Sequence, residues 1–211
     1  MRILAIADVH GSKEARKKVD AQIRDYIPNI VIVDGDITQF GPPAWAEEFL
    51  NSIMLKTLAL PGNCDPRGVL EAIENSQAIP LHAKKVDVGD YAVVGLGGSN
   101  ATPFGTPFEL SEDEIYSALD DLMVEGALLV VHAPPKGHVD KTSSQTHSGS
   151  QAIADIISKY SPPLVISAHI HEARGVEREG ATTYVNPGPA SRGYAAVIDL
   201  NGEVKVELIQ S

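Results

Sequence analysis

Short apolar runs, many of them rich in Ile and Val, alternate along the chain with amphipathic stretches. The early runs are apolar throughout, which predicts strands that are covered on both faces, as in a parallel sheet. We expect strands at Arg2–Ala7, Ile30–Val33, Thr57–Leu60, Tyr91–Leu96, Leu128–Val131, Leu164–Ser167, Thr182–Val185, Ala195–Leu200 and Val204–Leu208. From Gly175 onward the pattern changes to strands and turns, with hairpin turns expected at Glu177–Gly180 and Asn201-Gly202. The pattern therefore predicts β–α units followed by a β-rich segment.

Five amphipathic segments with apolar residues three or four positions apart predict helices between the strands. Their apolar faces span Ala15–Ile27, Trp45–Met54, Val69–Ile73, Ile115–Met123 and Ala152–Tyr160. Two helix starts have a sequence signature. Asp65-Pro66 is typical of an N-cap followed by proline in the first turn, and Ser111 with Glu114 is typical of a capping box. Residues 134–149, rich in Pro, Gly, Ser, Thr and His, predict a long irregular loop with a functional role.

The length of 211 residues predicts a single domain over residues 1–211 that buries its own core. The net charge of −11, from 17 basic and 28 acidic residues, argues against duplex nucleic acid and anionic membranes as partners. The apolar runs are far shorter than the roughly 18 residues of a membrane span. Asp8 and His10 interrupt the first run too early for a secretory signal. The lone cysteine, Cys64, excludes an intrachain disulfide and fits a reducing compartment, so we expect a cytoplasmic location.

Polar residues with metal-binding chemistry follow five separate apolar runs. They are Asp8 and His10, Asp36, Asn63, His132, and the pair His169 and His171. Because the carboxyl ends of parallel strands share one edge of a sheet, these side chains are expected to meet in one crevice. Imidazole, carboxylate and amide oxygen suit divalent ions such as Mn, Fe and Zn. A closed structural zinc site is not expected, because the sequence has no cluster of cysteines.

Taken singly, each of these residues has a structural interpretation. Asp8 fits a helix cap, Asn63 a turn residue and His132 a hydrogen-bonded structural histidine. Those interpretations need five independent coincidences at the ends of five strands, whereas one shared metal site explains all of them. We therefore predict a site for a pair of divalent cations, with the carboxylate of one residue able to bridge them.

The ordered series Asp8-x-His10, Gly35-Asp36, Gly62-Asn63, His132 and His169-x-His171 resembles the calcineurin-like metallophosphoesterase family over nearly the whole chain. Further stretches at Gly95–Asn100, His147–Ser150 and Asn186–Gly188 are similar to a small prokaryotic branch related to class III cyclic-nucleotide phosphodiesterases. The resemblance implies an α/β fold, a four-layer α-β-β-α sandwich with two mixed β-sheets face to face. It also implies that Asp8, His10 and His171 hold one metal, that Asn63, His132 and His169 hold the other, and that Asp36 bridges them.

The sequence departs from the family pattern at two positions. Ala168 stands where glycine is frequent, which we expect to be tolerated, and Cys64 stands where many members carry a histidine that protonates the leaving group. A thiol, with a pKa of roughly 8.5, is a poor substitute. We expect Cys64 to be a small packing residue and Asp65 to be a helix cap rather than an acid.

The resemblance implies hydrolysis of a phosphoester by a hydroxide that two metal ions share. We expect two divalent ions (Mn, Fe, Ni or Zn, with Mn favoured) and a small phosphoester substrate, possibly a nucleotide. The missing acid favours a phosphodiester over a monoester. Asn100 and His147 are the catalytic candidates. His138 has two interpretations, a replacement proton donor or a surface residue, and Arg192 has two, a phosphate contact or a surface residue. His82 is expected to be structural or exposed.

Three other functions stay open on the sequence alone. They are a phosphomonoesterase acting on a small metabolite, a metal hydrolase acting on a thioester or amide, and a non-catalytic interaction module on the same fold. The sequence predicts no oligomeric state.

Overall fold

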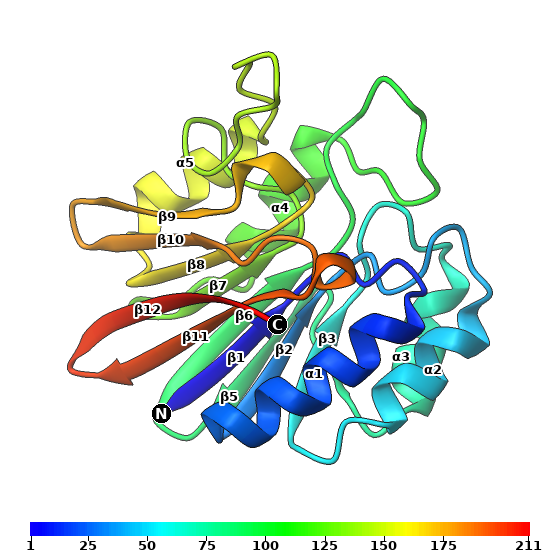
Figure 1. Cartoon of the computed structure of the whole chain (residues 1–211). Helices are drawn as coiled ribbons and strands as arrows, with labels where there is room; N and C mark the ends of the chain where they lie inside the picture. The colour runs from blue at the N-terminus through cyan, green and yellow to red at the C-terminus, as the bar shows by residue number, and fades with distance from the viewer.

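A computed structural model describes the whole chain, residues 1–211, and its centre consists of two six-stranded mixed sheets (Figure 1). The first sheet has the order β12-β11-β1-β2-β3-β4, in which β1 to β4 run parallel, while β11 pairs antiparallel with both β1 and β12. Its strands are β1 (Arg2–Ile6), β2 (Ile30–Asp34), β3 (Thr57–Leu60), β4 (Ile79–Pro80), β11 (Tyr194–Asn201) and β12 (Glu203–Gln210). Three consecutive parallel strands of this sheet, β1, β2 and β3, are therefore followed by loops on the same edge.

The second sheet has the order β5-β6-β7-β8-β10-β9. Strands β6, β7, β8 and β10 run parallel, and β5 and β9 pair antiparallel at the two edges. The strands are β5 (Lys84–Val88), β6 (Tyr91–Leu96), β7 (Leu128–Val131), β8 (Leu164–Ser167), β9 (Gly175–Glu179) and β10 (Thr182–Asn186). Strands β7 and β8 thus also end side by side.

Alternate residues of the central strands face different cores, which explains why the runs are apolar throughout. In β1, Leu4 and Ile6 pack toward helices, whereas Ile3 and Ala5 pack between the two sheets. The core between the sheets also contains Leu128 and Val130 from β7. The sheets therefore lie face to face with a shared apolar interior.

Helices cover the outer face of each sheet (Figure 1). They are α1 (Lys13–Tyr26), α2 (Pro43–Asn51), α3 (Gly68–Asn75), α4 (Glu112–Asp120) and α5 (Gln151–Tyr160), with short 3-10 turns η1 (His171–Ala173) and η2 (Ala190–Arg192). Buried residues of α1, α2 and α3 share a core with the first sheet, and those of α4 and α5 share one with the second. The predicted four-layer α-β-β-α sandwich is confirmed. None of the helices has the length and apolar character that crossing a bilayer requires.

Several predicted details differ from the structure. The capping box of Ser111 and Glu114 is confirmed at α4, but α3 begins after Arg67 without any side-chain cap, so the predicted cap at Asp65 is wrong. Met54 lies beyond the end of α2 and is exposed. Strand β9 continues through Glu177–Glu179, which shortens the predicted turn there. Residues 134–149 contain neither a helix nor a named strand, as predicted.

Candidate metal centre

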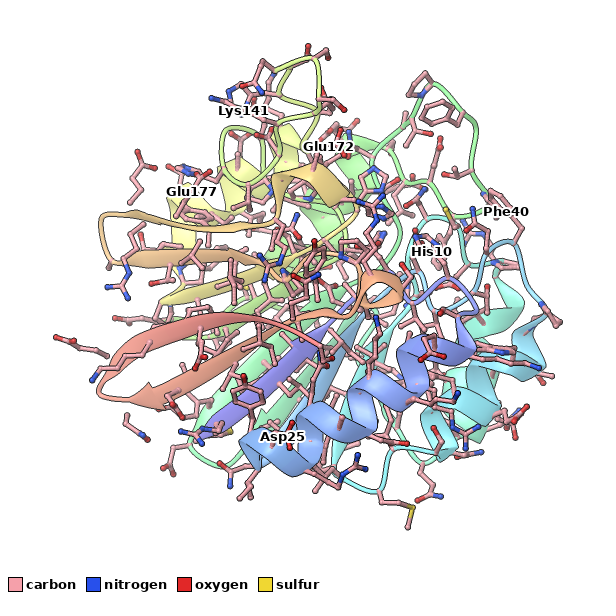
Figure 2. All side chains as sticks on the ribbon, in the orientation of Figure 1. His10, Asp25, Phe40, Lys141, Glu172 and Glu177 are labelled. Carbon is pink, nitrogen blue, oxygen red and sulfur yellow. The ribbon has the colours of Figure 1, made fainter.

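The loops that follow β1, β2, β3, β7 and β8 bring all seven predicted ligand residues into one cluster. They form two groups of three with one residue between them: Asp8, His10 and His171; Asn63, His132 and His169; and Asp36. Both sheets contribute, so neither sheet alone contains the site. Figure 2 shows His10 in the loop between β1 and α1.

The first group presents two imidazoles and a carboxylate to a common point. The Nε2 atoms of His10 and His171 lie 3.2 Å apart. Asp8 Oδ1 lies 3.4 Å from His171 Nε2 and 4.0 Å from His10 Nε2. Three ligand atoms at such separations, facing one space, fit a single cation with nitrogen and oxygen ligands.

The second group is arranged around the side-chain oxygen of Asn63. Asn63 Oδ1 lies 3.1 Å from His132 Nε2 and 2.7 Å from His169 Nδ1. His132 and Asn63 are buried, and His169 is half-buried. This group therefore offers two imidazole nitrogens and one amide oxygen.

Asp36 lies between the groups and directs one carboxylate oxygen toward each of them. Its Oδ1 is 3.4 Å from His132 Nε2, and its Oδ2 is 3.9 Å from His10 Nε2. The backbone N–H of Cys64 donates to Oδ1 at 2.8 Å and so fixes the orientation of the carboxylate. Such an orientation suits a carboxylate that two cations share.

The chemistry of the buried groups also fits cations. Both carboxylate oxygens of Asp8 are buried and have no hydrogen-bond partner. A buried carboxylate without hydrogen bonds costs on the order of several kcal/mol unless a positive charge compensates it. A divalent cation would compensate it, and the four histidines and Asn63 supply further ligand atoms.

Four residues of the cluster have left-handed backbone conformations. The φ angles are 54° at Asp8, 49° at His10, 48° at Asp36 and 64° at His169. Such conformations cost of order 1–3 kcal/mol at a residue with a side chain, and they persist where surrounding structure and function require them. Here they turn the side chains at the strand ends toward one another.

Two glycines permit the close approach of the loops. A Cβ atom at Gly35 would collide with the His132 ring, and one at Gly62 would collide with the Asp36 carboxylate. The backbone oxygen of Asp34 lies 2.8 Å from His132 Nδ1 and accepts a hydrogen bond from its N–H, which leaves Nε2 directed at the cluster.

Burial and charge set the protonation of the cluster. Burial, together with the charge of neighbouring His132, lowers the pKa of His169 to about 4, so this imidazole is neutral and able to act as a ligand. Burial alone would lower the pKa of His132, but Asp36 raises it to about 10. Burial raises the pKa of Asp34 to about 8. A cation bound beside His132 would compete with its proton.

Asp65 holds together the two loops that carry Asp36 and Asn63. Its Oδ1 accepts from the backbone N–H and the hydroxyl of Thr38 at 2.7 and 2.8 Å, and its Oδ2 accepts from Ile37 and Gly62 N–H at 3.0 and 2.9 Å. This role is not evident from the sequence, because the Asp-Pro pair resembles a helix cap.

Thr106 and Glu109 orient the amide of Asn63 and were also missed. Asn63 Nδ2 donates to Thr106 Oγ1 at 3.1 Å, and that hydroxyl in turn donates to Glu109 Oε1 at 2.7 Å. The amide oxygen is therefore directed toward His132 and His169. A Thr–Glu pair three residues apart in a loop carries no signal that distinguishes this role from ordinary loop hydrogen bonding.

A cavity of about 490 Å³ adjoins the cluster at His169. Asn100 lines it, donating weakly from Nδ2 to the backbone oxygen of Ser148 at 3.5 Å, while its buried Oδ1 has no partner. Thr146 and Ser148 line the cavity, but His147 between them does not; its ring is exposed and its Nδ1 lies 2.5 Å from the buried carboxylate of Asp140. The structure thus places Asn100, but not His147, in the wall of the cavity.

Cys64 lies in the wall of the centre rather than in an apolar core. Its thiol is half-buried and lies 3.7 Å from Asn63 Nδ2. The thiol also lies close enough to ligand atoms of His10 and Asp36 for the three to contact one cation. Burial and the negative charge of Asp36 raise the pKa of this thiol well above its ordinary value. Cys64 is therefore a neutral thiol at physiological pH and a weak proton donor.

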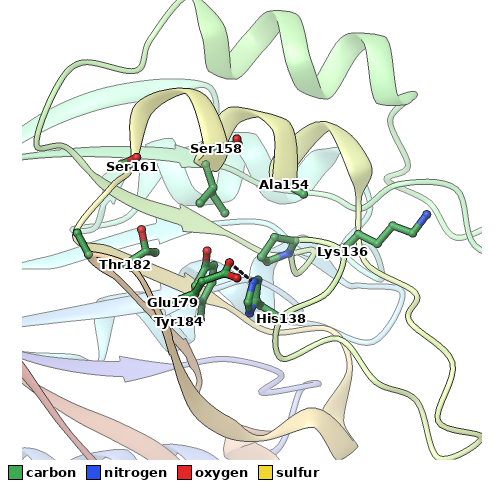
Figure 3. Close-up of a pocket in the computed structure, with 12 residues that line it drawn as sticks. Lys136, His138, Ala154, Ser158, Ser161, Glu179, Thr182 and Tyr184 are labelled. Atoms are coloured by element: carbon green, nitrogen blue, oxygen red, sulfur yellow. Dashed lines mark hydrogen bonds and ion pairs between the residues drawn. The ribbon is translucent and has the colours of Figure 1, made fainter.

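The two remaining histidines, His138 and His82, make contacts that fit a structural role. His138 lies away from the centre, between Glu177 and Glu179 at 3.0 Å each, and stacks on Tyr184 at the edge of a separate cavity of about 410 Å³ (Figure 3). His82 accepts a hydrogen bond from Gly97 N–H at 3.0 Å, as expected of a structural histidine.

The chain has sequence relatives in an archaeon and in animals. The chain is 34% identical to MJ1162, an uncharacterized protein of Methanocaldococcus jannaschii, and the match covers 90% of this chain and 89% of the relative. It is 28% identical to metallophosphoesterase domain-containing protein 1 of Homo sapiens, over 60% of this chain and 41% of that protein.

Solved structures share the fold at low sequence identity. TT1561 of Thermus thermophilus superposes with a TM-score of 0.77 at 22% identity, over 99% of this chain and 98% of that one. An archaeal phosphodiesterase superposes with a TM-score of 0.61 at 17% identity over the full length of both chains. The family model of calcineurin-like phosphoesterases matches residues 1–173. The strand-end cluster, the two-sheet sandwich and this match together show that the chain belongs to the calcineurin-like phosphoesterase family, whose members use divalent metal ions to hydrolyse phosphoesters.

Proposed function

We propose that this protein is a phosphodiesterase that works with two divalent cations, manganese being the favoured ion. The observation that carries the proposal is the position of Asp36, with one carboxylate oxygen toward His10 and the other toward His132. Asp8, His10 and His171 would hold one ion, and Asn63, His132 and His169 the other. When bound, the ions lower the pKa of water and offset the negative charge of a phosphoryl group.

The protein's own residues orient the substrate. No lysine or arginine lines the cavity beside His169, so the phosphoryl group of the substrate belongs at the cations rather than in that cavity. Asn100, in the cavity wall, is in a position to donate from its amide to the substrate. His147, paired with the buried Asp140, is proposed to act by holding the loop of residues 137–149, whose N–H groups at Gly137 and Gly149 also bind Asp140.

The surroundings of Cys64 favour a diester over a monoester. A neutral thiol with a raised pKa gives little help to a poor leaving group, so substrates whose leaving oxygen needs no strong acid are favoured. The archaeal structural neighbour is described as a phosphodiesterase, which agrees with this preference. The lone cysteine also fits a cytoplasmic location.

Turnover of a matched substrate pair tests the proposal. Chelator-stripped protein should hydrolyse bis(p-nitrophenyl) phosphate only after manganese is restored, and more efficiently than p-nitrophenyl phosphate. Preference for the monoester would favour the phosphomonoesterase alternative. Metal binding without turnover of either ester would favour the non-catalytic module, and turnover of a carboxylic ester alone would exclude phosphoester chemistry.

A further inference from the structure

The cavity beside His169 lies between two loops of different origin. Residues 100–104 follow β6, residues 142–148 precede α5, and Glu172 of η1 closes one end. Because His169 is shared by the cluster and the cavity, a molecule with its phosphoryl group at the centre would extend its organic part into this space. The volume of about 490 Å³ is within the range of small-molecule sites.

The lining combines apolar surface with hydrogen-bonding groups and carries no lysine or arginine. Five of its twelve residues have a hydroxyl group: Thr102, Thr142, Ser144, Thr146 and Ser148. The one acidic residue of the lining, Glu172, accepts from the backbone N–H and the hydroxyl of Ser143 at 2.7 and 2.8 Å. A second phosphate would meet a carboxylate and no cation here. The lining therefore suits an uncharged organic group with several hydrogen-bonding atoms.

One phenylalanine, Phe104, lines this cavity. It is 85% exposed, although an exposed phenyl ring gains nothing from folding. Of the other three phenylalanines, Phe49 and Phe108 are fully buried in the cores, whereas Phe40 is exposed on a loop outside the cavity lining. An exposed ring in the wall of a cavity offers a flat apolar face to a ligand.

Hydrogen bonds tie the backbone around Phe104 to the metal centre. Its N–H donates to Thr102 Oγ1 at 3.2 Å, and Thr102 donates to Glu109 Oε1 at 2.6 Å. Glu109 accepts from Thr106, which holds the amide of Asn63. The loop that presents the ring is thus linked by a chain of hydrogen bonds to Asn63, a proposed metal ligand.

We propose that this cavity binds the nucleoside part of the substrate, with the base stacked on Phe104 and the hydroxyl groups of the lining contacting its polar edge. This inference rests on the proposed function, because it places the phosphodiester of a nucleotide at the centre. It specifies the substrate class as a nucleoside phosphodiester with no second phosphate group. Base–aromatic stacking is tolerant of sequence, so purines and pyrimidines are both accepted.

Binding of free adenosine to metal-free protein tests the inference without turnover. We expect NMR titration to give a dissociation constant about tenfold higher for Phe104→Ala than for the wild type, the scale of one stacking contact. Phe104→Trp should bind as tightly as the wild type or more tightly. Met54→Ala, which removes an 81% exposed side chain outside the cavity, is the matched control. Equal affinity of Phe104→Ala and the wild type would overturn the inference.

Kinetics on two diesters that differ only in the base give a second test. We expect Phe104→Ala to raise KM about tenfold for the methyl ester of adenosine 5′-monophosphate and to leave KM unchanged for the methyl ester of ribose 5-phosphate. Equal increases for both esters would overturn the inference. If the wild type hydrolyses neither ester with metal restored, the proposed function fails, whereas adenosine binding that depends on Phe104 would still support the cavity as a nucleoside site.

Discussion

Removal of the Asp65 carboxylate should destabilise the protein strongly, even though the residue is neither a metal ligand nor a helix cap. The side chain is fully buried and accepts four hydrogen bonds from two loops. In Asp65→Ala, the backbone N–H groups of Ile37, Thr38 and Gly62 lose their partner. Each unsatisfied buried donor costs about 1–3 kcal/mol, so the expected loss in the free energy of unfolding is about 3 kcal/mol or more.

Asp65→Asn sharpens this prediction because it preserves the shape of the side chain. The amide oxygen can replace one carboxylate oxygen, but the amide NH₂ group then faces N–H donors on the other side. Both oxygens of Asp65 accept from two donors each, so neither orientation of the amide satisfies all four. We expect a loss of about 2 kcal/mol or more.

Urea unfolding followed by circular dichroism measures both losses. The pKa of Asp65 is raised to about 6 by burial and by Asp36, so measurements at pH 8 keep the carboxylate ionised. Asp25→Asn, which changes an exposed carboxylate on α1 (Figure 2), is the control and should change stability by less than about 0.5 kcal/mol. A loss below 1 kcal/mol in Asp65→Ala, or none in Asp65→Asn, would refute the assigned role.

Three further predictions address the centre and its surroundings. Asp36→Ala should lower manganese-dependent turnover by more than about 100-fold, because both groups of proposed metal ligands lose the carboxylate that they share. Activity near that of the wild type would exclude the bridging role. Cys64→His should raise the ratio of p-nitrophenyl phosphate to bis(p-nitrophenyl) phosphate turnover, because an imidazole is the better proton donor, and an unchanged ratio would mean that the position does not face the leaving group. Burial and neighbouring Arg67 lower the pKa of His82 to about 4, so the unfolded chain takes up a proton there that the folded chain does not. The free energy of unfolding should therefore fall by up to about 3 kcal/mol between pH 6.5 and pH 4 on account of this residue. His82→Asn keeps an acceptor for Gly97 N–H and should remove that part of the fall. Identical pH profiles of the free energy of unfolding for the wild type and the variant would contradict the prediction.

The central strands were predictable because both of their faces are buried. Apolar runs such as Ile30–Val33 leave little alternative to a strand between two cores. The edge strands β5 and β9 were missed because their sequences, KKVDV and GVERE, are mostly charged and exposed. Charged residues are a common protection of sheet edges, and they remove the periodic signal on which strand prediction depends.

The candidate ligands were predictable because the sheet topology alone brings strand ends together. The supporting residues were not, since their roles depend on contacts between loops. Asp65, Thr106 and Glu109 make hydrogen bonds across 3 to 43 positions of the chain, and the longest joins Thr106 to Asn63. The orientation of His147 away from the cavity likewise follows from its pairing with Asp140. Local sequence carries no information on which side of a loop faces the site.

Metal stoichiometry tests the central claim most directly. Wild-type protein and Asp36→Ala would be stripped with chelator, equilibrated with excess manganese, freed of unbound ion and analysed by mass spectrometry of the metal. The account predicts two manganese ions for each wild-type chain and fewer than two for the variant. A wild-type chain that binds no ion, or a variant that still binds two with unchanged affinity, would contradict it.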